Sequence, residues 1–207
     1  MEDKLSVIKS WLGSGSINFF GLPMSGKDTQ GLQLAKALDA VFLSSGEIIR
    51  QMEQERGQDL TSSGNLIPTN IFYEWVLPYF ERRELFGKPI VLSSIGRWSG
   101  EENQVMSVAK GSDHEIKAVI ALIISESDAK ARFSASKALG DRGNRTDDQS
   151  LDVLDHRLQE FREKTVPVLK HYQSLDLLIK IDDTGSRDTV FSEIVEKLYA
   201  KALKAQA

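Results

Sequence analysis

One ten-residue stretch, GLPMSGKDTQ at residues 21–30, constrains the fold of this chain more than any other. A short apolar run precedes it, and helix-forming residues follow it. Gly21, Gly26 and Lys27 match the G-x-x-x-x-G-K pattern of a phosphate-binding loop, in which backbone N–H groups and a helix N-terminus hold anionic oxygens. The pattern normally continues with Ser or Thr, whereas this chain has the acid Asp28.

Apolar runs and helical stretches alternate along the chain. Five apolar runs have the length of buried strands, at residues 17–20, 40–43, 89–92, 117–125 and 177–181. Helix-forming stretches lie before, between and after them, at residues 3–12, 29–38, 45–56, 69–84, 101–110, 128–138, 150–172 and 189–203. We expect Pro78 to kink or interrupt its helix. The alternation predicts an α/β fold whose parallel sheet is covered by helices on both faces.

Composition is that of an ordinary globular domain. The 207 residues suit a single domain, and 41% of them are hydrophobic. A formal net charge of −4 argues against broad nucleic-acid binding. The sequence has no cysteine, which excludes disulfides and Cys-ligated zinc or iron–sulfur sites. Because no apolar run approaches the roughly 20 residues of a membrane span, and the N-terminus lacks the pattern of a signal peptide, we expect a cytoplasmic protein that does not bind membranes.

Further motifs follow the glycine loop in a consistent order. They are LSSGEIIRQ, GNLIP, RTDD, HRL and TVP, which begin at residues 43, 64, 145, 156 and 165. Together with the loop, they resemble the signatures of adenylate kinases and related nucleoside monophosphate kinases. The resemblance covers nearly the whole chain, from residue 17 onward.

The resemblance implies a P-loop NTPase three-layer fold, with a five-stranded parallel sheet and two insertions. One insertion, at residues 46–84, would cover an acceptor nucleoside monophosphate, and a short lid would span residues 134–146. The implied reaction is reversible phosphoryl transfer from ATP, with Mg²⁺, to the acceptor. AMP is the favoured acceptor, with GMP, CMP or UMP as alternatives. The expected partners are small-molecule nucleotides, and the expected state is a monomer.

The resemblance also assigns site residues. Phosphoryl transfer depends on positioning and charge neutralisation, and the arginine fork supplies both because it binds phosphate through two hydrogen bonds and stays charged. The residues assigned to catalysis are Lys27, Arg132, Arg142, Arg145 and Arg157. Those assigned to ATP are Gly21, Pro23, Met24, Ser25, Gly26, Lys27, Asp28 and Thr29. Those assigned to the acceptor are Ser45, Gly46, Arg50, Ile67, Arg97 and Glu101.

The chain departs from the family pattern around the phosphate loop. Met24 and Asp28 stand where the family has glycines, so we expect residue 24 to have a negative φ. Ser93 replaces the acid at the end of the third strand, which in the family helps to hold the hydration shell of Mg²⁺. Gly96 replaces a proline and should loosen the turn before Arg97.

The two departures at Asp28 and Ser93 suggest one hypothesis. Mg²⁺ prefers oxygen ligands and usually keeps several waters. Asp28 would bind Mg²⁺, directly or through water, in place of the acid that is missing at Ser93. Two alternatives stay open: Asp28 points outward and pairs elsewhere, or the chain is a noncatalytic nucleotide-binding paralogue that has lost turnover.

Glu101 replaces the glutamine that reads adenine in the family. An ionised glutamate only accepts hydrogen bonds. It therefore suits the N–H groups of guanine, or the exocyclic amine of adenine or cytosine. The alternative is that Glu101 is an acid placed at a helix N-terminus, where the helix dipole favours it.

Overall fold

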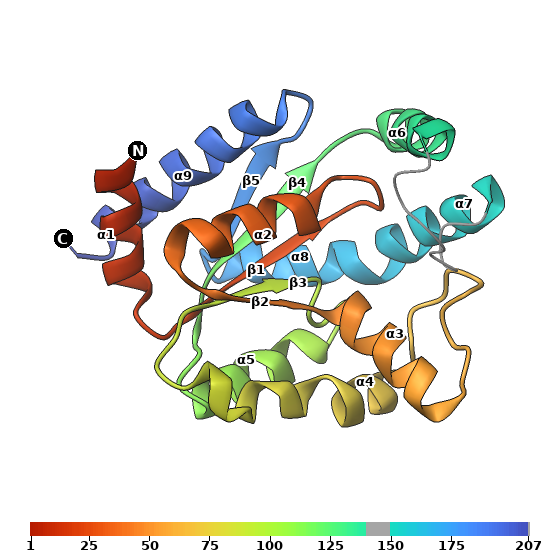
Figure 1. Ribbon diagram of the computed structural model, residues 1–207, viewed down its shortest axis with the longest axis horizontal. Helices are drawn as coiled ribbons and strands as arrows, with labels where there is room; N and C mark the ends of the chain where they lie inside the picture. Colours follow the sequence, from red (N-terminus) through yellow and green to blue (C-terminus); the bar gives the residue numbers. More distant parts are fainter. Residues whose placement is uncertain (140–149, 207) are drawn as a thin grey trace.

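The computed structural model describes residues 1–139 and 150–206. Within them, parallel strands form a five-stranded sheet in the order β2-β3-β1-β4-β5 (Figure 1). The strands are β1 (Ser16–Gly21), β2 (Val41–Ser44), β3 (Ile90–Ser93), β4 (Ile116–Ile123) and β5 (Leu178–Asp182). The predicted α/β fold is confirmed, and every strand bound lies within two residues of its prediction.

Strand β1 lies at the centre of the sheet, and all six of its residues are buried. Ile17 and Phe19 pack into the core on one face, and Phe20 packs into the core on the other. A central parallel strand is covered on both faces, which explains its nearly continuous apolar run. The side chain of Asn18 is the polar exception within residues 17–20. It donates to the carbonyl of Ile95 at 2.8 Å and accepts from the Ile95 N–H at 3.3 Å, and so fixes the loop after β3.

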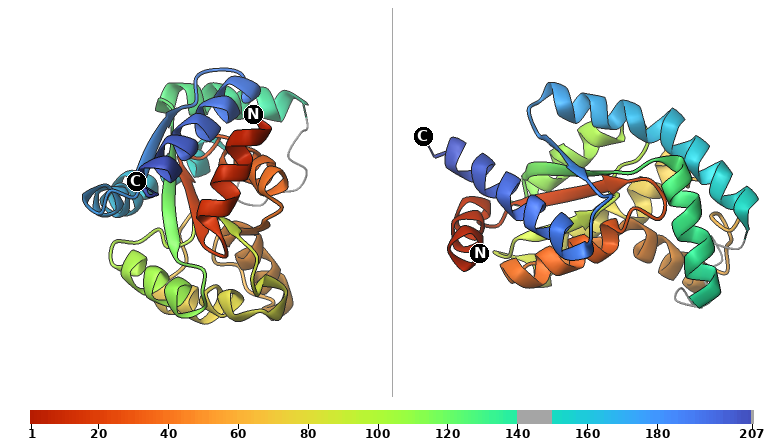
Figure 2. Two further views of the ribbon diagram at one scale, coloured as in Figure 1. Left: turned by 90° about the vertical axis from the view of Figure 1, so that its left-hand side faces the viewer. Right: turned by 90° about the horizontal axis from the view of Figure 1, so that it is seen from above.

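Two layers of helices cover the sheet (Figures 1 and 2). One face carries α1 (Glu2–Leu12), α2 (Lys27–Leu38) and α9 (Arg187–Lys204). The other face carries α3 (Ser45–Arg56), α4 (Thr69–Trp75), α5 (Glu101–Gly111) and α8 (Val166–Ser174). Helices α6 (Glu126–Leu139) and α7 (Leu151–Glu160) lie toward the carboxyl ends of the strands (Figure 2).

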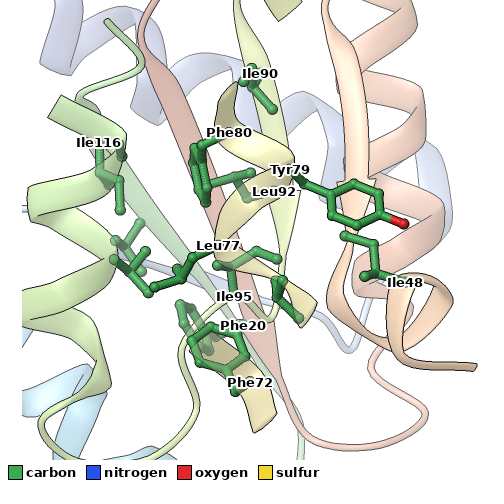
Figure 3. Packing of buried hydrophobic residues seen from close by; sticks show 14 of the residues in the cluster. Phe20, Ile48, Phe72, Leu77, Tyr79, Phe80, Ile90, Leu92, Ile95 and Ile116 are labelled. Atoms are coloured by element: carbon green, nitrogen blue, oxygen red, sulfur yellow. The ribbon is translucent and has the colours of Figure 1, made fainter. Parts of the chain in front are cut away.

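The core under α3, α4 and α5 holds the predicted acceptor-side insertion on the sheet. Figure 3 shows Phe72 of α4 beside Phe20 of β1, with Leu77 and Ile95 next to them. Ile48 of α3 belongs to the same core. Burial of a large apolar side chain contributes about 1.5–3 kcal/mol, so this core anchors the segment that lines the cleft described below.

The first and last helices pack against each other. Ile8 and Leu12 of α1 are fully buried, and they share one core with Val195 and Leu198 of α9. Lys4 of α1 also pairs with a glutamate of α9. Both ends of the described chain therefore lie at the same end of the sheet (Figure 1).

Two predicted helices are interrupted in the structure. The helix expected over residues 69–84 ends at Trp75 and continues as 3₁₀ segments η1 (Leu77–Glu81) and η2 (Arg83–Leu85). Pro78 explains the break because it lacks the N–H that an α-helix needs. The helix expected over 150–172 is divided into α7, a π-helical turn η4 (Phe161–Thr165) and α8. The turn ends two residues before Pro167, whose missing N–H disturbs the ladder in the same way.

The predicted lid lies partly on α6 and partly outside the described residues. Among the helices of residues 1–139 and 150–206, none is long and apolar enough to cross a membrane.

Candidate functional site

A cleft opens at the carboxyl ends of β1, β2 and β3. Its walls come from the phosphate loop, the start of α3, residues 61–67, the loop after β3, and α7. Most of the predicted site residues line it, namely Met24, Gly26, Lys27, Asp28, Thr29, Ser45, Gly46, Arg50, Ile67, Arg97, Glu101 and Arg157. The fold therefore brings together residues that are as much as 133 positions apart in the chain, from Met24 to Arg157.

The phosphate loop turns tightly between β1 and α2. A Cβ added at Gly21 would lie 2.3 Å from the Ser25 hydroxyl, so only glycine fits there. Gly26 caps α2 with a φ of 71°, a left-handed conformation that glycine adopts without strain. Lys27 is the first residue of α2, so the helix N-terminus faces the cleft. This arrangement has the positive dipole end and the cation that an anionic group requires.

Met24 has a φ of 71°, and the expected negative φ is wrong. A side chain with a Cβ in the left-handed region costs about 1–2 kcal/mol. The side chain is only 8% exposed and packs among apolar residues of α6 and α7. Burial of the side chain therefore offsets the strain of the backbone.

Asp28 contacts the end of β3. The Ser93 hydroxyl donates a hydrogen bond of 2.5 Å to Asp28 Oδ1. The alternative in which Asp28 points outward is therefore wrong, because the carboxylate lies between the loop and the strand end and lines the cleft. A carboxylate oxygen accepts more than one hydrogen bond, so the Ser93 contact leaves Asp28 able to bind a metal or its water.

Two arginines lie close together in the cleft. Desolvation and, to a lesser extent, repulsion from Arg157 lower the pKa of Arg97 to about 10, although Glu160, Glu101 and Asp28 oppose both effects. Arg97 stays protonated at neutral pH even so. Two guanidinium groups that repel each other in a desolvated cleft favour an anion between them.

Arg50 reaches the cleft from α3. A Cβ at Gly46 would lie 3.2 Å from Arg50 Nη1, so the glycine leaves room for the guanidinium. The hydroxyl of Ser45, the residue before Gly46, donates a hydrogen bond of 2.8 Å to the carbonyl of Ser94. This bond ties the start of α3 to the end of β3, where Ser94 itself has a φ of 57°.

The match to known proteins agrees with this geometry. The family described as AAA domain matches residues 17–163, a range that contains the phosphate loop and Arg157. The chain belongs to the AAA domain family. The predicted resemblance to adenylate kinases is also confirmed, at low identity, by curated relatives that bear this name.

Three adenylate kinases illustrate the similarity. The enzyme of Kocuria rhizophila is 27% identical over 86% of this chain and 95% of its own length. That of Thermus thermophilus is 24% identical over 86% of this chain and 94% of its own. That of Bartonella bacilliformis is 29% identical over 80% of this chain and 90% of its own. The similarity thus extends over almost the full length of each relative.

Arg132 of this AAA domain lies behind the phosphate loop and is not part of the cleft lining. It donates to the carbonyl of Met24 at 3.3 Å and to Asp183 Oδ2 at 2.5 Å. Burial raises the pKa of Asp183, and the ion pair with Arg132 opposes that rise. Gly21, Pro23 and Ser25 are also outside the cleft lining. Arg142 and Arg145 lie outside the described residues.

Glu101 is 2% exposed and joins three segments of the site. Its Oε2 accepts from the N–H groups of Arg97 and Trp98 at 2.9 and 3.0 Å. Its Oε1 accepts from the Thr69 hydroxyl of α4 at 2.8 Å. Burial raises the pKa of Glu101 despite these hydrogen bonds. The residue therefore fixes the loop that carries Arg97, and it also lines the cleft.

Sequence reasoning missed the contact between residues 61–67 and α7. A Cβ on Gly64, whose φ is 85°, would lie 2.9 Å from Arg157 Cγ, and Glu160 Oε2 accepts from the Leu66 N–H at 3.2 Å. Lys164 also bonds Glu160 at 2.6 Å and lies 3.8 Å from the centre of the Trp98 ring. Gly64 was the available signal, because a glycine at positive φ marks a turn or a close approach.

Proposed function

We propose that this chain is a nucleoside monophosphate kinase, which reversibly transfers the γ-phosphoryl group of ATP to a nucleoside monophosphate. One observation carries the proposal: Lys27 at a helix N-terminus and the arginines Arg50, Arg97 and Arg157 line one cleft. Phosphoryl transfer between two nucleotides needs this concentration of fixed positive charge. The similarity to adenylate kinases supports the same reaction.

The residues divide into roles by their place in the cleft. The loop N–H groups and Lys27 would hold the ATP phosphates. Arg50 and Arg97 would hold the acceptor phosphate, and Arg157 would neutralise charge on the transferring group. By resemblance, Arg132 would approach the donor nucleotide, and Arg145, or Arg142 in its place, would act with Arg157 on the transferring group. Arg132 would also support the loop from behind, given its bond to the Met24 carbonyl.

The oxygen donors near the loop fit a magnesium ion. Asp28, Thr29 and Ser93 line the cleft together, and Mg²⁺ takes hard oxygen ligands and water. Asp28 would bind the ion or its water, and Ser93 would hold the carboxylate in place through its hydrogen bond. When bound, Mg²⁺ supplies charge neutralisation at the β- and γ-phosphates.

The segments around the cleft complete the proposal. Residues 46–84 would cover the acceptor, residues 134–146 would form the lid, and AMP would be the preferred acceptor. Glu101 leaves GMP, CMP and UMP open. The protein would act in the cytoplasm as a monomer.

A coupled assay for nucleoside diphosphate production tests the function directly. With ATP and Mg²⁺, we expect turnover on AMP and slower turnover on GMP, CMP and UMP. Lys27→Ala should abolish turnover, whereas Lys88→Ala, at an exposed position outside the cleft, should not. The second candidate is a noncatalytic nucleotide-binding paralogue, which the loss of the strand-end acid at Ser93 favours. Saturable ATP binding without diphosphate formation on any acceptor would establish that candidate.

A further inference from the structure

Met24 combines two features that a phosphate loop does not require. Its backbone is in the left-handed region, with a φ of 71°. Its side chain is nevertheless large and almost fully buried. A strained residue persists only where its surroundings hold it, and such residues concentrate at functional sites. A glycine would relieve the backbone and leave the apolar contact unfilled.

The side chain of Met24 joins the loop to two helices. It belongs to a buried cluster with residues of the β4–α6 junction, α6 and α7, which are Ile124, Ala129, Phe133, Leu154 and Leu158. Met is unbranched and adaptable, so it fills an irregular gap between elements well. An ion pair of 2.6 Å between Lys130 and Asp155 holds α6 and α7 to each other near this cluster.

The backbone of Met24 is attached to α6 as well. Its carbonyl accepts a hydrogen bond of 3.3 Å from Arg132, which is also paired with Asp183 after β5. Helix α7 also carries Arg157, which lines the cleft and lies between the cluster residues Leu154 and Leu158 in the sequence. A continuous set of contacts therefore runs from the phosphate loop through Met24 to the helix that holds Arg157.

We propose that Met24 is a positioning residue that fixes the phosphate loop relative to α7, and so sets the placement of Lys27 against Arg157. This inference rests on the proposed function for its kinetic part only. Its structural part, the coupling of the loop to α7, holds for any nucleotide-binding activity of the cleft.

Hydrogen exchange without nucleotide tests the structural part. Leu154→Ala removes the α7 side of the contact and leaves the loop sequence intact. We expect amide exchange in residues 21–28 to rise about tenfold in Leu154→Ala and in Met24→Gly. Met24→Leu should retain slow exchange because it fills the same space. Leu198→Ala, in the separate core of α9, is the matched cavity control and should lower Tm without changing the loop.

Kinetics test the positioning part. Met24→Gly and Leu154→Ala should lower kcat about tenfold with a smaller change in the KM for ATP, and Met24→Leu should restore kcat. Unchanged loop exchange in Leu154→Ala would overturn the proposal, as would a Met24→Gly variant with parental exchange and kcat. If the parent protein shows no turnover, the proposed function fails, whereas the exchange result still decides the coupling.

Discussion

The two ends of the cleft differ in how they depart from the family pattern. Under the proposed function, the donor end comprises the phosphate loop and Ser93, and the acceptor end comprises Arg50, Arg97 and Glu101. At the donor end, two of the changed residues touch: Asp28 replaces a glycine, Ser93 replaces the strand-end acid, and the two side chains share a hydrogen bond of 2.5 Å. At the acceptor end the arginines are kept.

The difference shows which chemistry tolerates change. A carboxylate near a hydrated metal can come from either of two adjacent elements, because water transmits its effect. A guanidinium that holds phosphate through two hydrogen bonds has no such freedom, since its planar geometry must meet the ligand directly. The carboxylate of the donor end can thus change its place, whereas an arginine that binds the acceptor phosphate cannot.

Among the changes that test this difference, removal of an arginine from the acceptor end should have the largest effect. Arg97→Ala should lower kcat/KM for the acceptor about 10³-fold, because the desolvated cation that would hold the acceptor phosphate is lost. ATP binding, measured by calorimetry, should change little. Arg83→Ala, at an exposed position of η2, is the control and should resemble the parent. Loss of ATP affinity equal to the loss of turnover would place Arg97 at the donor end instead.

Removal of the acid at Asp28 should impair the donor end, and its return at Ser93 should restore it. Asp28→Gly should lower the affinity for Mg²⁺ or the activity about 10–100-fold, which is the usual effect of losing a residue that supports the ligands of a metal. Adding Ser93→Asp to that variant returns the acid to the strand end and should recover most of the activity. A titration of Mg²⁺ at fixed ATP, read by turnover and by the rise in Tm, checks both. If the parent and Asp28→Gly need the same Mg²⁺ concentration for turnover, the hypothesis that Asp28 replaces the strand-end acid is wrong.

A smaller effect should appear in the pH dependence of stability at the acceptor end. The pKa of Glu101 is raised in the folded protein above the ordinary value of 4.5, so the folded state binds its proton more tightly than the unfolded state does. Stability from this group is therefore greatest at low pH and is lost as pH rises through the folded-state pKa. Glu101→Gln should remove that loss, because glutamine keeps acceptors for the Arg97 and Trp98 N–H groups and does not ionise.

Urea unfolding at pH 4 and pH 8 measures this effect as the difference between parent and Glu101→Gln. The parent should lose more stability than the variant between the two values. A parent that gains stability relative to the variant at high pH would show that the hydrogen bonds outweigh burial at Glu101.

The smallest effect should follow from crowding Arg50. Gly46→Ala brings a methyl group to 3.2 Å from Arg50 Nη1, and the flexible end of that side chain can shift. We expect the acceptor KM to rise about threefold, or roughly 0.7 kcal/mol, with kcat and ATP binding unchanged. Steady-state kinetics with varied acceptor checks this, and an equal rise in the KM for ATP would contradict it.

Much of the fold could be predicted from sequence because buried parallel strands leave continuous apolar runs. Residues 17–20, for example, predicted β1 to within one residue at each end. The break at Pro78 followed from its missing N–H. The π-helical turn at Phe161–Thr165 could not be predicted, because the residues on either side of it continue one helical pattern.

The site was less predictable where contacts join distant residues. The resemblance supplied Arg50 and Arg97, whereas the bond between Asp28 and Ser93 spans 65 positions and depends on how α2 lies against β3. The φ of Met24 was predicted with the wrong sign because the packing energy of a side chain can exceed a backbone preference. Arg132 was assigned to catalysis, but nothing in the sequence indicated its partner Asp183.

The pairing of α1 with α9 has a practical consequence for how the molecule can be linked to others. Both ends of the described chain lie at one end of the sheet, and the phosphate loop lies at the other (Figure 1). A fusion partner or a surface tether at either end would leave the cleft open to solvent. Nearby termini also suit circular permutation, in which a short linker joins the ends and new ones are cut in an exposed loop.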